Sequence, residues 1–209
     1  LVSCDIVKGF VLVDQIYPHV GGIKIGLEFF TSCGLLGLEK IKKLEIPIFI
    51  DLKLYDIPNT VKQALSNILQ FEPKYTTLHL SGGSEMLIEC VKVKNELNSR
   101  TKLIGVTMLT SFNNTLISEI GIEKSVNENV KQLTQLAVNC SMDGIVCSPQ
   151  EISEVKNTHG NKLPIISPGI RGKENSSNDQ KRTLSAKEAI NAGADILVIG
   201  RPITDAKDP

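Results

Sequence analysis

A chain of 209 residues is long enough to bury a full hydrophobic core, either as one large domain or as two small ones. Its 23 lysines and arginines balance its 23 aspartates and glutamates, so no net charge draws it toward nucleic acid or a membrane surface, and we expect neither as a partner. No apolar stretch is long enough to span a bilayer, and the first residues show no signal-peptide pattern.

The five cysteines do not form a framework for disulfides or metal. Their number is odd, they include no Cys-x-x-Cys pair, and none of the three histidines lies at ligand spacing from any of them. We therefore expect reduced thiols in a cytoplasmic protein and no metal site.

Short apolar runs alternate with longer amphipathic stretches along the whole chain. Apolar residues recur at helical spacing over 28–44 and again over 58–71, where Pro58 predicts the start of a helix. Such alternation predicts parallel strands joined by helical crossovers, and eight strands favour an α/β fold of the (β/α)8 TIM-barrel class. The predicted strands are 1–4, 21–26, 46–51, 75–80, 102–107, 143–147, 163–168 and 195–199.

An open, doubly wound sheet is the alternative fold. It would require a glycine-rich fingerprint after the first strand, and residues 2–6 contain none. No linker divides the chain, so we expect a single domain over 1–209, with a flexible lid at about 171–181 in its most polar stretch. Because the chain begins with Leu1 and ends just past the last predicted strand, we expect that it lacks its true N-terminus and its last helix.

Charged residues follow the apolar run at 48–50. Side chains alternate along a strand, so Asp51 and Lys53 share one face with Phe49, and Asp56 follows in the turn, close enough to join them. Burying three charges together is costly unless they pair. Alone, the pattern fits a catalytic cluster and a merely stabilising ion pair about equally well.

Polar residues at the other strand ends favour the catalytic interpretation, because the active site of this barrel class lies at the carboxyl ends of the strands. Lys24 lies within an apolar strand, where a lysine needs a carboxylate or an anionic ligand. His79 lies alone on an apolar strand, so we interpret it as a hydrogen-bonded core residue. The polar residues at or near these ends are Asp5, Lys24, Asp51, Lys53, His79, Ser81, Thr107, Thr110, Ser111, Ser167, Arg171 and Arg201.

Two glycine–arginine groups predict a phosphate site. Gly169 and Arg171 follow the seventh predicted strand, and Gly200 and Arg201 follow the eighth. Backbone N–H groups at a glycine turn approach an anion closely, and arginine binds phosphate through two hydrogen bonds. Arg201 could instead be a surface residue beside Asp205, but its position favours phosphate.

By its motifs the chain resembles the orotidine 5′-monophosphate decarboxylase family, in its bacterial form. The match runs nearly end to end with the family's order and spacing. One departure is that the segment from Asp5 to Val13 is a few residues shorter than is usual in the family. The matching segments are VDQ at 13–15, KIGLE at 24–28, DLKLYDIPNT at 51–60, HLSGG at 79–83, VTMLTS at 106–111, DGIVCS at 143–148, PGIR at 168–171, DQKR at 179–182 and GRPIT at 200–204.

The resemblance implies a role for each matching residue. Lys53 is the implied catalytic lysine, in a charged array with Asp51, Asp56 and Lys24. Family members are homodimers, and the residue equivalent to Asp56 reaches into the partner's site. The implied substrate contacts are Asp5 and Lys24 for the ribose hydroxyls, Thr60, Thr110 for the pyrimidine, and Arg171, Gln180, Gly200 and Arg201 for the phosphate.

The implied reaction converts orotidine 5′-monophosphate into uridine 5′-monophosphate and CO2, without a cofactor. The bond to CO2 leaves an electron pair on a ring carbon, C6, that has no obvious electron sink. A fixed ammonium in a water-poor site stabilises such charge far better than water does. Lys53 fits this role and can then donate a proton to C6.

Three alternatives stay open. One is another phosphosugar enzyme that uses the same array with a divalent metal, and a second uses Lys53 as a Schiff-base nucleophile, although flanking carboxylates would hold its amine protonated. The third is a nucleotide-binding protein without catalysis, which the intact array disfavours.

Overall fold

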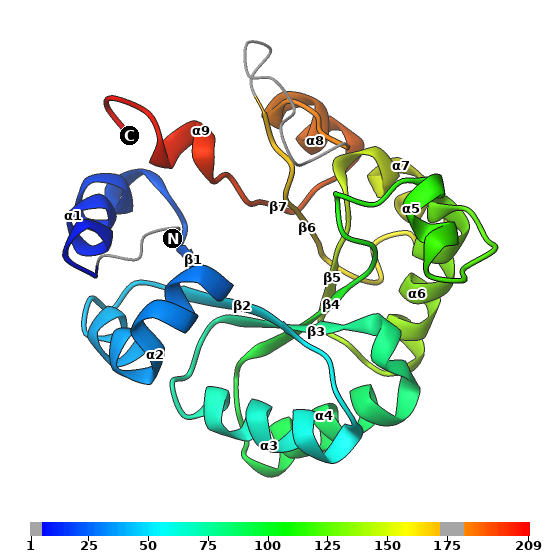
Figure 1. Ribbon diagram of the computed structural model, residues 1–209, viewed down its shortest axis with the longest axis horizontal. Helices are drawn as coiled ribbons and strands as arrows, with labels where there is room; N and C mark the ends of the chain where they lie inside the picture. The colour runs from blue at the N-terminus through cyan, green and yellow to red at the C-terminus, as the bar shows by residue number, and fades with distance from the viewer. Residues whose placement is uncertain (1–5, 172–181) are drawn as a thin grey trace.

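The computed structural model describes residues 6–171 and 182–209. Within these ranges seven strands form one sheet in which every neighbouring pair is parallel and the spatial order follows the chain order. The sheet curls upon itself, and the helices lie around its outside (Figure 1). This arrangement confirms the predicted barrel class, because a doubly wound sheet reverses its strand order and carries helices on both faces.

The secondary-structure elements fall into the predicted alternation. The strands are β1 (Ile23–Ile25), β2 (Ile48–Leu54), β3 (Tyr75–His79), β4 (Lys102–Val106), β5 (Gly144–Val146), β6 (Ile165–Ser167) and β7 (Ile196–Leu197). The helices are α1 (Ile6–Ile16), α2 (Leu27–Lys42), α3 (Pro58–Leu69), α4 (Gly83–Glu96), α5 (Asn114–Glu119), α6 (Val126–Asn139), α7 (Ile152–His159), α8 (Ala186–Ala192) and α9 (Arg201–Thr204). Short 3-10 turns occupy Tyr17–His19, Leu80–Gly82 and Pro149–Glu151.

Seven of the eight predicted strands overlap observed ones, and the first, 1–4, lies outside the described residues. The predicted end of β2 falls short, because the strand continues past 51 to Leu54 and carries Lys53, whereas the other overlapping predictions end one or two residues beyond the observed strands. No helix in the described ranges is both long and apolar enough to cross a membrane.

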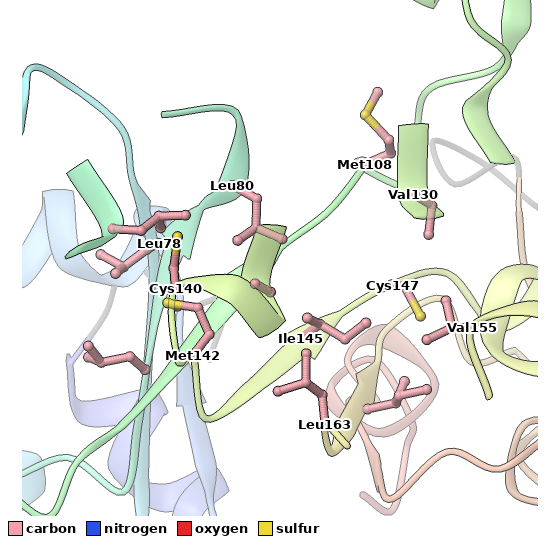
Figure 2. Close-up of a cluster of buried hydrophobic side chains, with 14 of the residues drawn as sticks. Leu78, Leu80, Met108, Val130, Cys140, Met142, Ile145, Cys147, Val155 and Leu163 are labelled. Carbon is pink, nitrogen blue, oxygen red and sulfur yellow. The ribbon is translucent and has the colours of Figure 1, made fainter. Parts of the chain in front are cut away.

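The two faces of the curled sheet bury different cores. Ile48 and Ile50 point outward and pack with α2 residues such as Phe29, whereas Phe49 between them points inward. Phe49 meets Ile104 and Ile166 inside the barrel. The larger core lies between the later strands and their helices (Figure 2). Apolar side chains thus fill part of the barrel interior, and the polar residues of β1 and β2 lie beyond them toward the carboxyl ends of the strands.

Candidate active site

A cavity of about 720 Å³ opens at the carboxyl ends of the strands. Residues from β1, β2 and the segments after β4, β6 and β7 line it, so most of the barrel contributes to its wall. Seven of the residues predicted to form the site line it together, namely Lys24, Asp51, Lys53, Thr110, Arg171, Gly200 and Arg201. Apolar residues such as Leu27, Val106, Val198 and Ile199 complete the wall.

A carboxylate between two ammonium groups forms one side of the cavity. Asp51 Oδ2 lies 3.0 Å from Lys24 Nζ, and Asp51 Oδ1 lies 2.9 Å from Lys53 Nζ. Of the two partners predicted for Lys24, a carboxylate or an anionic ligand, the structure shows the carboxylate, and it confirms the pairing of Asp51 with Lys53. Because both lysine side chains stay about a third exposed while Asp51 is buried, the ammonium groups can face a ligand as well as their counterion.

Electrostatics keep this carboxylate ionised. Burial alone would raise the pKa of Asp51, but the ammonium groups of Lys24 and Lys53 more than offset it and hold that pKa below its usual value. Asp51 is therefore an anion at neutral pH, and it lies between the two lysine ammonium groups. Charge pairing of this kind lets the site hold fixed cations in a partly buried position.

Thr77 is part of this cluster, although no local sequence pattern predicts it. Its buried hydroxyl donates to Asp51 Oδ1 at 3.1 Å and accepts the backbone N–H of Lys53 at 2.8 Å. Alternation along β3 places it on the same face as His79, but a threonine on a buried strand is common, and nothing local distinguishes it from Thr76.

Asp56 and Thr60 lie away from the cavity. Both are exposed, and the Asp56 carboxylate accepts the backbone N–H of Ile57 at 2.6 Å. Within the described ranges no ion pair joins Asp56 to Lys53. The exposed Asp56 carboxylate thus lies outside the ion-paired cluster of its own chain as described, and its predicted catalytic role stays a prediction.

His79 forms the hydrogen bond that was predicted, but it is only half-buried and is therefore not a core residue. Its Nδ1 accepts the backbone N–H of Ser81 at 3.3 Å, and its ring stacks on Tyr55 at a centroid distance of 5.6 Å. Burial, together with the nearby Lys53 ammonium, lowers the pKa of His79. The imidazole is therefore neutral at pH 7 and adds no charge to the cluster.

The other end of the cavity carries the predicted phosphate-binding residues. Gly169 has a φ of +77°, which suits glycine, and a side chain there would meet the Arg182 carbonyl at 3.0 Å. Arg171 lies beyond it, and Gly200 precedes the first residue of α9, Arg201. Two further predicted contacts, Asp5 and Gln180, lie outside the described residues.

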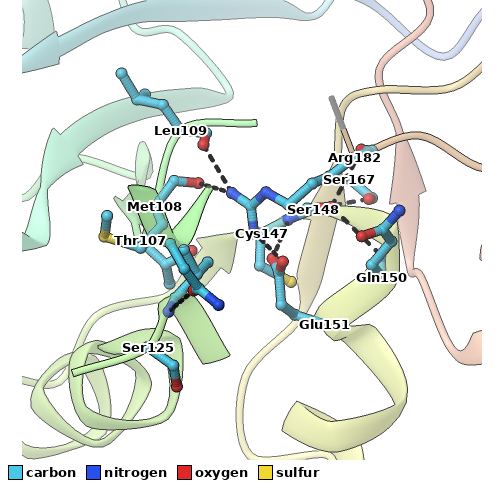
Figure 3. Close-up of polar contacts among 12 residues, drawn as sticks. Thr107, Met108, Leu109, Ser125, Cys147, Ser148, Gln150, Glu151, Ser167 and Arg182 are labelled. Carbon is cyan, nitrogen blue, oxygen red and sulfur yellow. Dashed lines mark hydrogen bonds and ion pairs between the residues drawn. The ribbon is translucent and has the colours of Figure 1, made fainter. Parts of the chain in front are cut away.

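A buried ion pair anchors this end of the barrel (Figure 3). The Arg182 guanidinium pairs with Glu151 and also donates to the carbonyl of Leu109 at 2.7 Å, next to the cavity residue Thr110. The Ser148 hydroxyl in turn donates to the Arg182 carbonyl at 3.2 Å. Arg182 thus ties the segment that follows β6 to the segment that follows β4. Sequence reasoning placed Arg182 within a matching motif but gave it no role.

No group of three or more potential metal ligands from histidine, cysteine, aspartate and glutamate occurs among the described residues. The charged groups that line the cavity are two ammonium groups paired with one carboxylate, and two guanidinium groups at the other end. This arrangement suits an anionic ligand.

Comparisons with known proteins agree with the geometry. The family model described as "Orotidine 5'-phosphate decarboxylase / HUMPS family" matches residues 5–209. Orotidine 5′-phosphate decarboxylase of Wolbachia pipientis subsp. Culex pipiens is 46% identical over 205 residues, which cover 98% of this chain and 89% of that protein. The enzyme of the same name from Ehrlichia chaffeensis is 46% identical over 206 residues, covering 98% and 88%.

Solved structures show the same fold. Orotidine 5′-phosphate decarboxylase of Lactobacillus acidophilus superposes with a TM-score of 0.77 at 31% identity, over 94% of this chain and 88% of that one. An uncharacterised conserved protein from Geobacillus kaustophilus gives a TM-score of 0.83 at 26% identity, over 99% of this chain and 91% of that one.

Proposed function

The chain belongs to the orotidine 5′-phosphate decarboxylase / HUMPS family and converts orotidine 5′-monophosphate into uridine 5′-monophosphate and CO2 in pyrimidine synthesis, and we propose that Lys53 is its catalytic residue. The observation that carries the proposal is the Lys24–Asp51–Lys53 cluster on the cavity wall. In the proposal, the Lys53 ammonium of this cluster stabilises the carbanion.

In the proposed step the bond between C6 and the carboxylate breaks, and its electron pair stays on C6. The Lys53 ammonium stabilises this charge and then donates a proton to C6, so the lysine is left neutral and regains its proton from solvent. Asp51 keeps Lys53 charged and oriented at 2.9 Å. Asp51 near the substrate carboxylate would also raise the energy of the bound substrate.

The remaining cavity residues are proposed to bind the substrate. Arg171, Gly200 and Arg201 would hold the phosphate with Gln180, Thr110 would contact the pyrimidine, and Lys24 would contact the ribose with Asp5. Binding energy from the phosphate, remote from C6, can then be used to orient the reacting ring. The chain is proposed to be one barrel domain, and the lid expected at about 171–181 lies, except for Arg171, outside the described residues.

We further propose a cytoplasmic homodimer. Asp56 and Thr60 are exposed in the segment after β2, next to the exposed apolar residues Tyr55 and Ile57. A carboxylate that turns away from its own cavity can complete the cavity of a neighbouring subunit across a two-fold interface. This placement accounts for Asp56 lying outside the cluster of its own chain.

Turnover is expected to need no metal ion. Decarboxylation is measured as the loss of orotidylate absorbance, in one sample before and in another after exhaustive chelation of metal ions. Full activity is expected in both samples, because Lys53 supplies the positive charge. Activity restored only by Mg²⁺ would instead favour the metal-dependent phosphosugar reaction. A covalent adduct trapped by borohydride in the presence of substrate would point to Schiff-base chemistry.

Arg201→Ala is expected to lower kcat/KM for the nucleotide by roughly 100-fold or more, because a charge-assisted pair with the phosphate is lost. The nucleoside without phosphate should be a poor substrate for the wild-type protein, and the substitution should barely change its turnover. Arg100, an exposed arginine just before β4, provides the matched control, since Arg100→Ala should leave both substrates unaffected. If the substitution lowered kcat/KM equally for the nucleotide and the nucleoside, Arg201 would not be a phosphate-binding residue.

A further inference from the structure

β2 does not run in simple register along β3. Ile50 pairs with Thr76, but the next paired residue of β2 is Leu54, opposite Leu78. The stretch between them is a bulge that contains both Asp51 and Lys53. Lys53 takes up the distortion with a φ of +50°, a conformation that is uncommon for any residue other than glycine. The proposed catalytic lysine thus stands on a strained part of the strand.

One hydroxyl supports this bulge from the neighbouring strand. The backbone N–H of Lys53 donates to Thr77 Oγ1 at 2.8 Å in place of a strand carbonyl. The same hydroxyl donates its own proton to Asp51 Oδ1 at 3.1 Å, the oxygen that also accepts Lys53 Nζ. Thr77 therefore contacts both the backbone of Lys53 and the counterion of its ammonium.

We infer that Thr77 is a positioning residue for the decarboxylation, whose hydroxyl fixes the strained backbone of Lys53 and the orientation of Asp51 so that Lys53 Nζ faces the reacting carbon. The inference rests on the proposed role of Lys53. Thr77 itself does not line the cavity, so it acts through these two residues. A strained backbone persists only where its surroundings determine it, and this hydroxyl supplies two of those constraints.

The adjacent Thr76 provides a matched control. Both threonines are fully buried on β3, one residue apart, but Thr76 is on the opposite face of the strand. Its hydroxyl makes no hydrogen bond within the described part of the chain. Replacing Thr76 by valine exchanges a buried, unpaired hydroxyl for a methyl group of similar size, and it should leave activity unchanged and stability equal or higher.

The experiment compares Thr77→Val, Thr77→Ser and Thr76→Val in the full-length protein. Each variant is measured for thermal unfolding, affinity for uridine 5′-monophosphate, kcat and KM. Thr77→Val is expected to lower kcat by about 10- to 100-fold, the range for a lost hydrogen bond to a charged group. KM and product affinity should change by less than about threefold, because the phosphate and pyrimidine contacts lie on other elements. Thr77→Ser retains the hydroxyl and should restore kcat to nearly the wild-type value.

Two results would overturn the inference. One is a Thr77→Val protein with the kcat of Thr76→Val. The other is a Thr77→Val protein that does not fold although Thr76→Val does. In that case the Thr77 hydroxyl would stabilise the strand and would not position Lys53. Lys53→Ala, measured in parallel, separates this test from the proposed function. An active Lys53→Ala protein contradicts the role of Lys53, whereas an inactive one beside a fully active Thr77→Val protein contradicts the positioning role alone.

Discussion

Lys53→Ala is expected to lower kcat by several orders of magnitude while the protein stays folded. The ammonium would serve twice, first by stabilising the carbanion and then by donating the proton to C6, so one substitution removes both contributions. The fold should survive because Asp51 keeps Lys24 at 3.0 Å and the Thr77 hydroxyl at 3.1 Å. The buried carboxylate is then not left without a cation.

The measurement is kcat at saturating substrate, with thermal unfolding and binding of uridine 5′-monophosphate as tests of folding. Lys62 offers a matched control, because its ammonium lies 3.4 Å from Glu89 on the outer helices, away from the cavity. Lys62→Ala should retain wild-type kcat, since this partly exposed pair lies on the outer helices and contacts no cavity residue. Near-normal turnover by a folded Lys53→Ala protein would contradict the mechanism.

Alternation along β2 was enough to predict much of the site. The pattern of Ile48, Phe49 and Ile50 correctly separated the outer core from the inner one, because side chains on a strand alternate between its faces. The same rule placed Asp51 and Lys53 together, and the cost of burying a lone lysine predicted a carboxylate or an anionic ligand beside Lys24, where the structure has Asp51. These inferences depend only on local geometry and on charge.

Thr77 could not be predicted, because its role depends on the bulge in β2. Regular alternation gives no bulge, and without one a buried hydroxyl on β3 has no special partner on its neighbour. The end of β2 was wrong for a related reason. The predicted strand stops at Asp51, whereas β2 continues through the irregular stretch to Leu54.

The Arg182–Glu151 pair shows a second limit of sequence reasoning. The local signal at Ser148 and Glu151 is a helix-capping pattern, and the structure contains that capping box. Glu151 also meets Arg182 from a distant part of the chain, and Arg182 reaches Leu109 from yet another. These contacts join segments that follow the neighbouring strands β4, β5 and β6, and the sequence contains no local pattern that predicts them.

Asp56 provides the test of quaternary structure. Its carboxylate is exposed and caps the Ile57 N–H, and it makes no ion pair with the Lys53 of its own chain within the described ranges. If it completes the site of a partner subunit, Asp56→Ala should be nearly inactive although its own Lys24–Asp51–Lys53 cluster is unaltered. An effect confined to stability would instead make Asp56 a capping residue only.

Subunit mixing decides which chain Asp56 serves. Lys53→Ala and Asp56→Ala dimers of the full-length protein are each expected to be nearly inactive, but a mixed dimer has one doubly damaged site and one intact site. Random exchange makes about half of the dimers mixed, so about a quarter of all sites should recover. Asp51→Asn is the control partner for Lys53→Ala, because Asp51 lies 2.9 Å from Lys53 of its own chain and the two defects cannot complement. If exchange is confirmed by mass spectrometry and no activity returns with Asp56→Ala, Asp56 belongs to the site of its own subunit.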